Sequence, residues 1–319
     1  MTALLLGLVL LPVLNALPTR ADTVKIAHPT WVGDGPLYIA RDKGIFKKNG
    51  VDVDLIVTED PKFPTLIADK IQMIAGTVDA ALLYLKEPTD FQYVVAIDDS
   101  NGGDGIVAVN DIKSIADLKG KKVAVNELTV SEFYLNVLLD KAGLKESDLN
   151  TVNMTAADAG KAFAAKSVDA AVTWEPWLTK GKSTDFGHLL VDSSTTPGLI
   201  TDVLIVKTAW ANAHKKDVEA IVKSWNEAVA YYRANPEESI AIMAKGVGGW
   251  LKDPNEFKST LSGIKFYGSD ENKTFFGTKA KPGPLATTVQ QAIDIWSRHG
   301  KLQVKVTPAD LISYSYVDD

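Results

Sequence analysis

The sequence predicts an α/β protein of two lobes joined by two crossing segments, with a helical region at its C-terminal end. Strand-like and helix-like stretches alternate from residue 22 to about residue 206, which is typical of sheets connected by helical crossovers. The last third then shows helical periodicity alone. The length of 319 residues is enough for two domains, and 46% apolar with 23% charged residues fits a packed globular protein.

The first stretch of the chain predicts one half of this architecture. Short β-branched or alternating runs predict strands at 23–29, 51–57, 71–77 and 91–98. Helices are expected at 36–48, 62–69 and 78–86. Pro36 stands near the first turn of the first helix and Gly50 follows its end, which is the usual placement of these residues. The alternation predicts a mostly parallel sheet.

The second stretch repeats the pattern. Strands are expected at 105–109, 121–127, 168–174, 188–194 and 201–206, and helices at 128–143 and 156–167. The glycines at 102, 103 and 105 mark a first crossing, and "PGLITDV" marks the return. We therefore expect a discontinuous lobe 1 (22–104 with 206–319) and a lobe 2 (105–205). The helical C-terminal region belongs to lobe 1.

The first residues predict an export signal. An apolar run from Ala3 to Leu14 is followed by "TRA", which puts small residues at the −3 and −1 positions, so residues 1–21 are expected to be cleaved off after Ala21 as a signal peptide. The run is too short to span a bilayer comfortably. Because no Lys or Arg precedes it, an uncleaved membrane anchor is the alternative interpretation. The chain has no cysteine, which excludes disulfides, thiolate catalysis and a lipid-modified N-terminal cysteine. A periplasmic protein is expected.

Several classes of function are disfavoured. The net charge of −6 without a basic block argues against nucleic-acid binding. The motifs of dinucleotide, phosphate-loop, serine-hydrolase and zinc-protease sites are absent, so no cofactor is expected. The four histidines are far apart in sequence and give no metal-ligand spacing, so no metal site and no catalytic residues are predicted.

Polar and aromatic side chains follow the predicted strands, where ligands bind in open α/β sheets. Such a set offers apolar walls and a few directed polar groups, as small-molecule sites do. Thr129 has a second interpretation, because it can simply cap its helix, with Glu132 at capping-box spacing. The candidate ligand-binding residues are Trp31, Asp34, Thr58, Glu59, Thr77, Ser100, Asn101, Thr129, Trp174, Glu175 and Asp202.

Four ordered blocks resemble one known family. They are "WVGDGPLYIARDKGIFKKNGVDVDL", "DDSNGGDGIVA", "IADLKGKKVAV" and "VDAAVTWEPW". They resemble the periplasmic substrate-binding proteins of nitrate/sulfonate/taurine ABC transporters. The resemblance implies a bilobal periplasmic-binding-protein clamp that closes on its ligand by hinge motion, with an ABC permease and an ATPase as partners. It also places Trp31, Asn101, Thr129, Trp174, Glu175 and Asp202 in the pocket, with Thr58, Glu59 and Thr77 less closely matched.

The ligand stays open at this point. Many relatives carry an aromatic where this chain has Asp34, and the candidate set has acids but almost no Lys or Arg. A zwitterion such as taurine fits, with its sulfonate on the helix that follows Thr129 and its ammonium near the acids. A small cation such as guanidinium also fits, as does a pyrimidine stacked on the indoles. Pyrimidine-precursor synthases share the fold, but they would need histidines gathered at the site. Replacing Trp31 or Glu175 with Ala is expected to abolish binding with little loss of stability.

Overall fold

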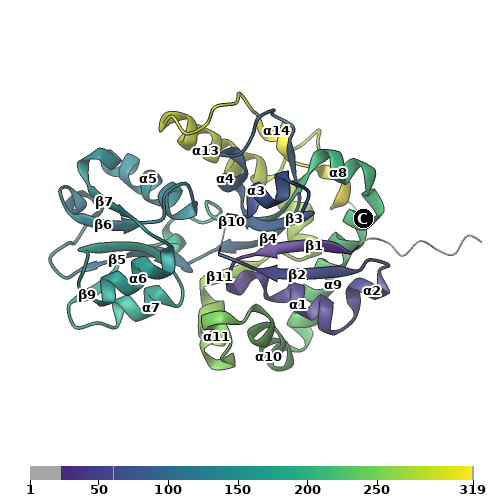
Figure 1. Cartoon of the computed structure of the whole chain (residues 1–319), viewed down its shortest axis with the longest axis horizontal. Helices are drawn as coiled ribbons and strands as arrows, with labels where there is room; N and C mark the ends of the chain where they lie inside the picture. Colours follow the sequence, from purple (N-terminus) through teal and green to yellow (C-terminus); the bar gives the residue numbers. More distant parts are fainter. Residues whose placement is uncertain (1–22, 60, 318–319) are drawn as a thin grey trace, which may run out of the picture.

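The computed structural model describes residues 23–59 and 61–317, and it shows two α/β lobes side by side (Figure 1). The predicted signal peptide lies outside the described residues. Among the described helices, none is both long and apolar enough to cross a membrane. The predicted two-lobed fold is confirmed, whereas the prediction of mostly parallel sheets is wrong, because both sheets mix parallel and antiparallel pairs.

Lobe 1 is built on a six-stranded sheet. In spatial order its strands are β11 (Ile264–Phe266), β4 (Phe91–Ser100), β10 (Thr201–Lys207), β3 (Met73–Thr77), β1 (Val24–His28) and β2 (Val53–Val57). The pairs made by β1 are parallel, and β10 runs antiparallel to both of its neighbours. This reversal follows from the route of the chain, because β10 enters lobe 1 from lobe 2 rather than through a crossover helix.

Helices cover both faces of this sheet (Figure 1). One face packs on α3 (Lys62–Ile67), α4 (Val78–Leu82) and α13 (Pro284–Arg298). The other face packs on α1 (Gly35–Asp42), α9 (Lys215–Ala234) and α10 (Pro236–Val247). The expected single helix at 36–48 is two, α1 and α2 (Ile45–Lys48), because Gly44 adopts a positive φ between them. The remaining helices are α8 (Thr208–Ala213), α11 (Pro254–Thr260), α12 (Ser269–Phe276) and α14 (Pro308–Leu311).

Lobe 2 is built on a five-stranded sheet. Its strands are, in spatial order, β7 (Asn150–Asn153), β6 (Lys122–Val125), β8 (Ala170–Trp174), β5 (Asp104–Val109) and β9 (Gly187–Asp192). The helix α5 (Val130–Ala142) covers one face, and α6 (Ala156–Ala164) with α7 (Trp177–Lys182) covers the other. The short strands β7 and β11 were not predicted from the sequence, and neither were α7 and α12.

The sheets also locate the two crossings. The expected division placed residues 105–205 in lobe 2, but β10 begins at Thr201 and belongs to the sheet of lobe 1. Likewise, β5 begins at Asp104 in lobe 2. We therefore propose residues 23–103 with 201–317 as lobe 1 and residues 104–200 as lobe 2, with each crossing immediately before one of these strands.

The two lobes share one apolar core on the side of α5 and α13. The ring centroids of Phe133 and Trp296 are 5.7 Å apart, and both side chains are fully buried. Polar contacts flank them, since Glu132 of α5 pairs with Lys301 at 2.9 Å and Asp140 pairs with Arg298. Burial of this kind stabilises by roughly 1.5–3 kcal/mol per large apolar side chain. This side therefore holds the lobes together.

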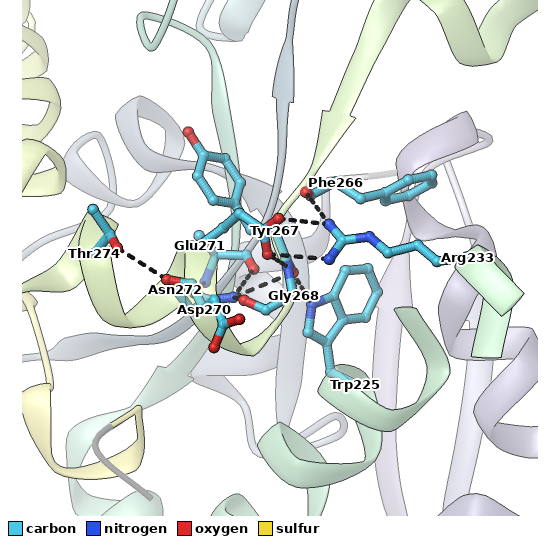
Figure 2. Close-up of polar contacts among 10 residues, drawn as sticks. Trp225, Arg233, Phe266, Tyr267, Gly268, Asp270, Glu271, Asn272 and Thr274 are labelled. Carbon is cyan, nitrogen blue, oxygen red and sulfur yellow. Dashed lines mark hydrogen bonds and ion pairs between the residues drawn. The ribbon is translucent and has the colours of Figure 1, made fainter. Parts of the chain in front are cut away.

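A polar network fixes the edge of the lobe 1 sheet beside β4 (Figure 2). The indole of Trp225 donates to the carbonyl of Tyr267 at 2.8 Å, and Arg233 pairs with Glu271 at 2.9 Å. Asn272 accepts a hydrogen bond from the backbone N–H of Ala96 at 2.8 Å and donates to its carbonyl at 3.0 Å. These contacts hold the stretch from β11 to α12 against β4, the strand that carries the acids described next.

Candidate ligand-binding site

Trp31 lies at the junction of the two lobes, in the loop between β1 and a short 3-10 helix, η1 (Val32–Asp34). Its side chain is 6% exposed, and its Nε1–H donates to Oδ2 of Asp98 at 3.1 Å. A Cβ on Gly33 would lie 1.6 Å from that oxygen, so only glycine permits this contact. A Cβ on Gly103 would lie 2.7 Å from the far edge of the indole. The ring is thus held between the lobe 1 sheet and the first crossing segment.

Carboxylates gather beside this indole. Asp202 is paired in the sheet with Asp98 on one side and with Thr77 on the other. Directly paired residues in antiparallel strands project their side chains from the same face. Asp98, Asp202 and Asp34 are 0%, 7% and 1% exposed. Burial raises the pKa of Asp98 and of Asp202 well above the ordinary value, and the negative charge of nearby carboxylates raises both further.

Two more buried acids extend this group. Burial raises the pKa of Asp79 to about 7, against the opposing effect of a hydrogen bond from Thr77. Burial raises the pKa of Asp104, at the start of β5, to about 7, and a hydrogen bond with Ser100 opposes the change. Asp99 projects from the opposite face of β4, where it accepts the backbone N–H of Gly198. Its pKa is raised to about 6, again mainly by burial.

Positive charge near these acids is sparse. Lys62, at the start of α3, is partly buried, and burial lowers the pKa of its ammonium. The negative charges of three acids raise this pKa and so oppose the effect of burial; the acids are Glu59, Asp34 and Asp202. His28 Nδ1 lies 3.4 Å from Oδ2 of Asp34, an oxygen that receives no hydrogen bond within the described residues. The site is therefore rich in buried acceptors.

Lobe 2 contributes aromatic side chains at the same junction. Trp174 ends β8 and packs against the lobe 1 core that includes Trp31. Trp177 of α7 meets Trp250 of η5 (Gly249–Leu251) in lobe 1, with their ring centroids 6.0 Å apart. The backbone of Gly249 lies close to Thr30, because a Cβ placed on Gly249 would be 3.0 Å from the methyl group of Thr30. The pair of indoles therefore joins the two lobes next to the Trp31 loop.

Several candidates serve local structure. Thr129 caps α5, as its second interpretation held, because its hydroxyl oxygen accepts the N–H of Ser131 at 3.3 Å. Glu132 follows in the first turn of α5 and accepts the N–H of Leu128 at 2.5 Å. A buried carboxylate there opposes an anionic ligand at this helix end. Glu175, in a cis bond to Pro176, accepts the N–H of Thr179 at 3.0 Å at the start of α7.

The other candidates lie at the edge of this group. Ser100 is buried and shares a 2.8 Å hydrogen bond with Ser193. Asn101 is exposed, and its N–H donates to the carbonyl of Gly263. Glu59 is exposed and accepts the N–H of Thr30 at 2.8 Å. Thr58 is partly buried just beyond β2.

The structure brings Trp31, Asp34, Thr77 and Asp202 together, and it adds Asp98, which the sequence did not single out. Asp98 lies inside the ten-residue strand "FQYVVAIDDS", directly after the buried run at 93–97. A charged residue inside such a run was the available signal. Within the described residues, no group of three or more histidines and acids could hold a metal ion.

Comparisons with known proteins agree with this architecture. A sequence model described as NMT1/THI5 like matches residues 33–239. A putative binding protein of Brucella abortus is 28% identical over 282 residues, covering 87% of this chain and 86% of the relative. The taurine-binding periplasmic protein of Escherichia coli is 27% identical over 222 residues, covering 66% of this chain and 64% of the relative.

Solved structures share the fold. The periplasmic aliphatic sulphonate-binding protein SsuA of Escherichia coli superposes with a TM-score of 0.74 at 20% identity, covering 93% of this chain and 98% of that one. The periplasmic nitrate-binding protein NrtA of Synechocystis superposes with a TM-score of 0.67 at 17% identity, covering 88% and 82%. These likenesses show the periplasmic-binding-protein fold, as predicted.

Proposed function

This chain belongs to the NMT1/THI5-like family, and from that premise we propose that it is the substrate-binding component of an ABC importer. It captures a small ligand between its two lobes in the periplasm and delivers it to a membrane permease driven by an ATPase. The curated relatives that match most of its length are named as binding proteins, which supports capture rather than catalysis.

The proposed ligand carries a positively charged nitrogen. The observation that carries this proposal is the group of buried carboxylates at the lobe junction, formed by Asp34, Asp98 and Asp202. An ionised carboxylate removed from water is costly unless a partner compensates it. A cationic nitrogen supplies that partner and fills the acceptor oxygens with N–H donors.

The indoles support the same ligand. Trp31, Trp174 and the Trp177–Trp250 pair supply large aromatic faces, which attract cations over the ring. A plain anion is disfavoured, because acids surround Asp202, and burial lowers the pKa of the nearby Lys62 ammonium. Taurine, which bears an ammonium group, and guanidinium are therefore the first compounds to test.

A thermal-shift panel tests the proposal. A ligand present at 100 times its Kd stabilises the folded state by about 2.7 kcal/mol. The panel contains taurine, an alkanesulfonate, nitrate, guanidinium and a hydroxymethylpyrimidine. A shift with taurine or guanidinium supports the proposal. A shift with nitrate or the alkanesulfonate alone overturns the positively charged ligand, and a shift with the pyrimidine alone favours a stacked neutral ring.

A matched pair of variants locates the site. Asp202→Asn removes one buried charge at the lobe junction, whereas Asp294→Asn makes the same exchange on the exposed face of α13. The Asp202→Asn variant should lose the ligand-induced shift, and the Asp294→Asn variant should keep it. Equal shifts in both variants would place the ligand elsewhere.

A further inference from the structure

Asp98 is the most deeply placed acid of the candidate site. It is fully buried within β4, and its carboxylate accepts the Nε1–H of the Trp31 indole, which lies 3.1 Å from Oδ2 and 3.4 Å from Oδ1. Its neighbour across the sheet is Asp202, which is 7% exposed. Two buried carboxylates on adjacent strands repel each other when both are ionised, which favours a proton on one of them.

The surrounding charges do not relieve this repulsion. Other acids add negative charge around the pair: Asp34 from η1, Asp79 from α4, Asp104 from β5, and Asp99 on the opposite face of β4. Lys62 of α3 interacts electrostatically with Asp202, and it interacts in the same way with Glu59 and Asp34. Lys265 of β11 acts on Asp99, and His28 and Tyr38 lie beside Asp34. Carboxylates thus outnumber cations around the pair within the described chain.

We propose that Asp98 and Asp202 share one proton in the ligand-free protein, and that the positively charged group of the ligand displaces it to solvent. This inference rests on the proposed function, because it concerns the same ligand. In the balanced step, one O–H bond of the carboxyl pair breaks, the proton passes to water or buffer, and the ligand nitrogen takes its place. Asp98 is then a specificity determinant, because a neutral ligand cannot compensate the second negative charge.

The direction of the pH dependence follows. Below the pH at which the pair loses its proton, proton and ligand compete, so affinity for a cation rises with pH by up to about tenfold per unit. Above that pH the affinity levels off. The raised pKa values of Asp98 and Asp202 agree with this direction.

Two measurements test the proposal, and the first needs no ligand. In protein labelled with 13C at its aspartate carboxyl carbons, a signal that is lost in Asp98→Asn should retain the protonated chemical shift at pH 7. If the carboxyls of Asp98 and Asp202 are both ionised at pH 7, the proton-sharing proposal is overturned, and the proposed function is untouched.

The second measurement counts the protons. Taurine and guanidinium are titrated calorimetrically at pH 7 in phosphate and in Tris, whose ionisation enthalpies differ. We expect the heats to differ between buffers by an amount equal to about one proton released per ligand bound. Equal heats in both buffers, with binding intact, overturn the proposal. If the carboxyl proton is present but neither compound binds, the proposal of a cationic ligand is overturned. The proposal that a ligand displaces the proton is then overturned as well.

Variants separate charge from structure. Asp98→Asn keeps an acceptor for the indole of Trp31 and removes one charge, so proton release should disappear and affinity for the bound probe should fall at least tenfold. Its melting temperature should stay equal or rise, because a buried charge is gone. Asp294→Asn on the exposed face of α13 should match the parent protein in all respects. A lowered melting temperature with unchanged proton release in Asp98→Asn would assign Asp98 a purely structural role.

Discussion

Replacing Trp31 with Phe tests how the aromatic wall is held. The exchange keeps an aromatic ring and deletes the Nε1–H that donates to Asp98 at 3.1 Å. Both partners are buried, at 6% and 0% exposure, so water cannot replace the lost donor. A hydrogen bond to a charged group contributes about 1.5–3 kcal/mol, and this is the expected loss of unfolding free energy where Asp98 is ionised.

The loss should depend on pH. The hydrogen bond from Trp31 lowers the pKa of Asp98 against the larger effect of burial, so it favours the ionised carboxylate. Its removal therefore costs most above the pKa of Asp98 and progressively less as the pH falls and the carboxyl protonates in both proteins. Urea unfolding followed by circular dichroism at pH 5 and pH 9 measures the difference.

Two further variants are compared with Trp31→Phe. Trp31→Ala should lose about 3–5 kcal/mol, because it also removes a buried aromatic ring. The burial of Trp31 thus contradicts the sequence-based expectation that its removal leaves stability almost unchanged. Trp210→Phe is the control, since Trp210 is half-buried at the edge of the lobe 1 core and keeping an aromatic ring on His214 should limit the loss to about 1 kcal/mol. Parent-like stability of Trp31→Phe at both pH values, or a larger loss at pH 5, would refute the reasoning.

Three other predictions concern the lobes and their acids. Lys301→Met leaves the buried carboxylate of Glu132 without its 2.9 Å partner, and because Lys301 is one-third exposed we expect a loss of about 1–3 kcal/mol in urea unfolding at pH 7. A change below about 0.5 kcal/mol would show that the pair is solvated. Trp250→Ala removes the contact with Trp177 across the lobes, so stopped-flow dissociation of the bound probe should accelerate about tenfold while association changes little. An unchanged dissociation rate would exclude a role in closure. Asp104→Asn should remove on the order of 1 kcal/mol per pH unit from the fall in unfolding free energy between about pH 4 and pH 7, because the raised pKa of Asp104, about 7, keeps its proton longer in the folded state. A pH slope equal to that of the parent protein would contradict the assigned burial.

The sequence predicts the architecture well and the directions of the strands poorly. Alternating strand and helix patterns correctly indicate two α/β lobes, because periodicity reports which faces are buried. Periodicity carries no information on strand direction, so the reversed β5 and β10 were not foreseen. The error at the second crossing has the same origin, since the run that forms β10 can be assigned to either lobe until its partners are known.

The sequence also predicts part of the candidate site and misses the rest. Trp31, Asp34 and Asp202 were selected by their positions at strand ends, and they do lie together. Thr129 was selected by the same rule and caps its own helix, because a hydroxyl at a helix start serves either purpose. Asp98 escaped selection because it lies within a strand, where side-chain direction depends on a pairing that only the fold supplies.

Calorimetric titration with matched ligand pairs tests the cationic ligand most directly. Guanidinium and urea share a planar shape and differ in charge, and taurine and isethionate differ by an ammonium group in place of a hydroxyl. We predict that the member bearing the positive nitrogen binds in at least one pair while its partner binds at least tenfold more weakly. Binding of urea or isethionate that equals or exceeds that of its partner would contradict a site built around buried carboxylates.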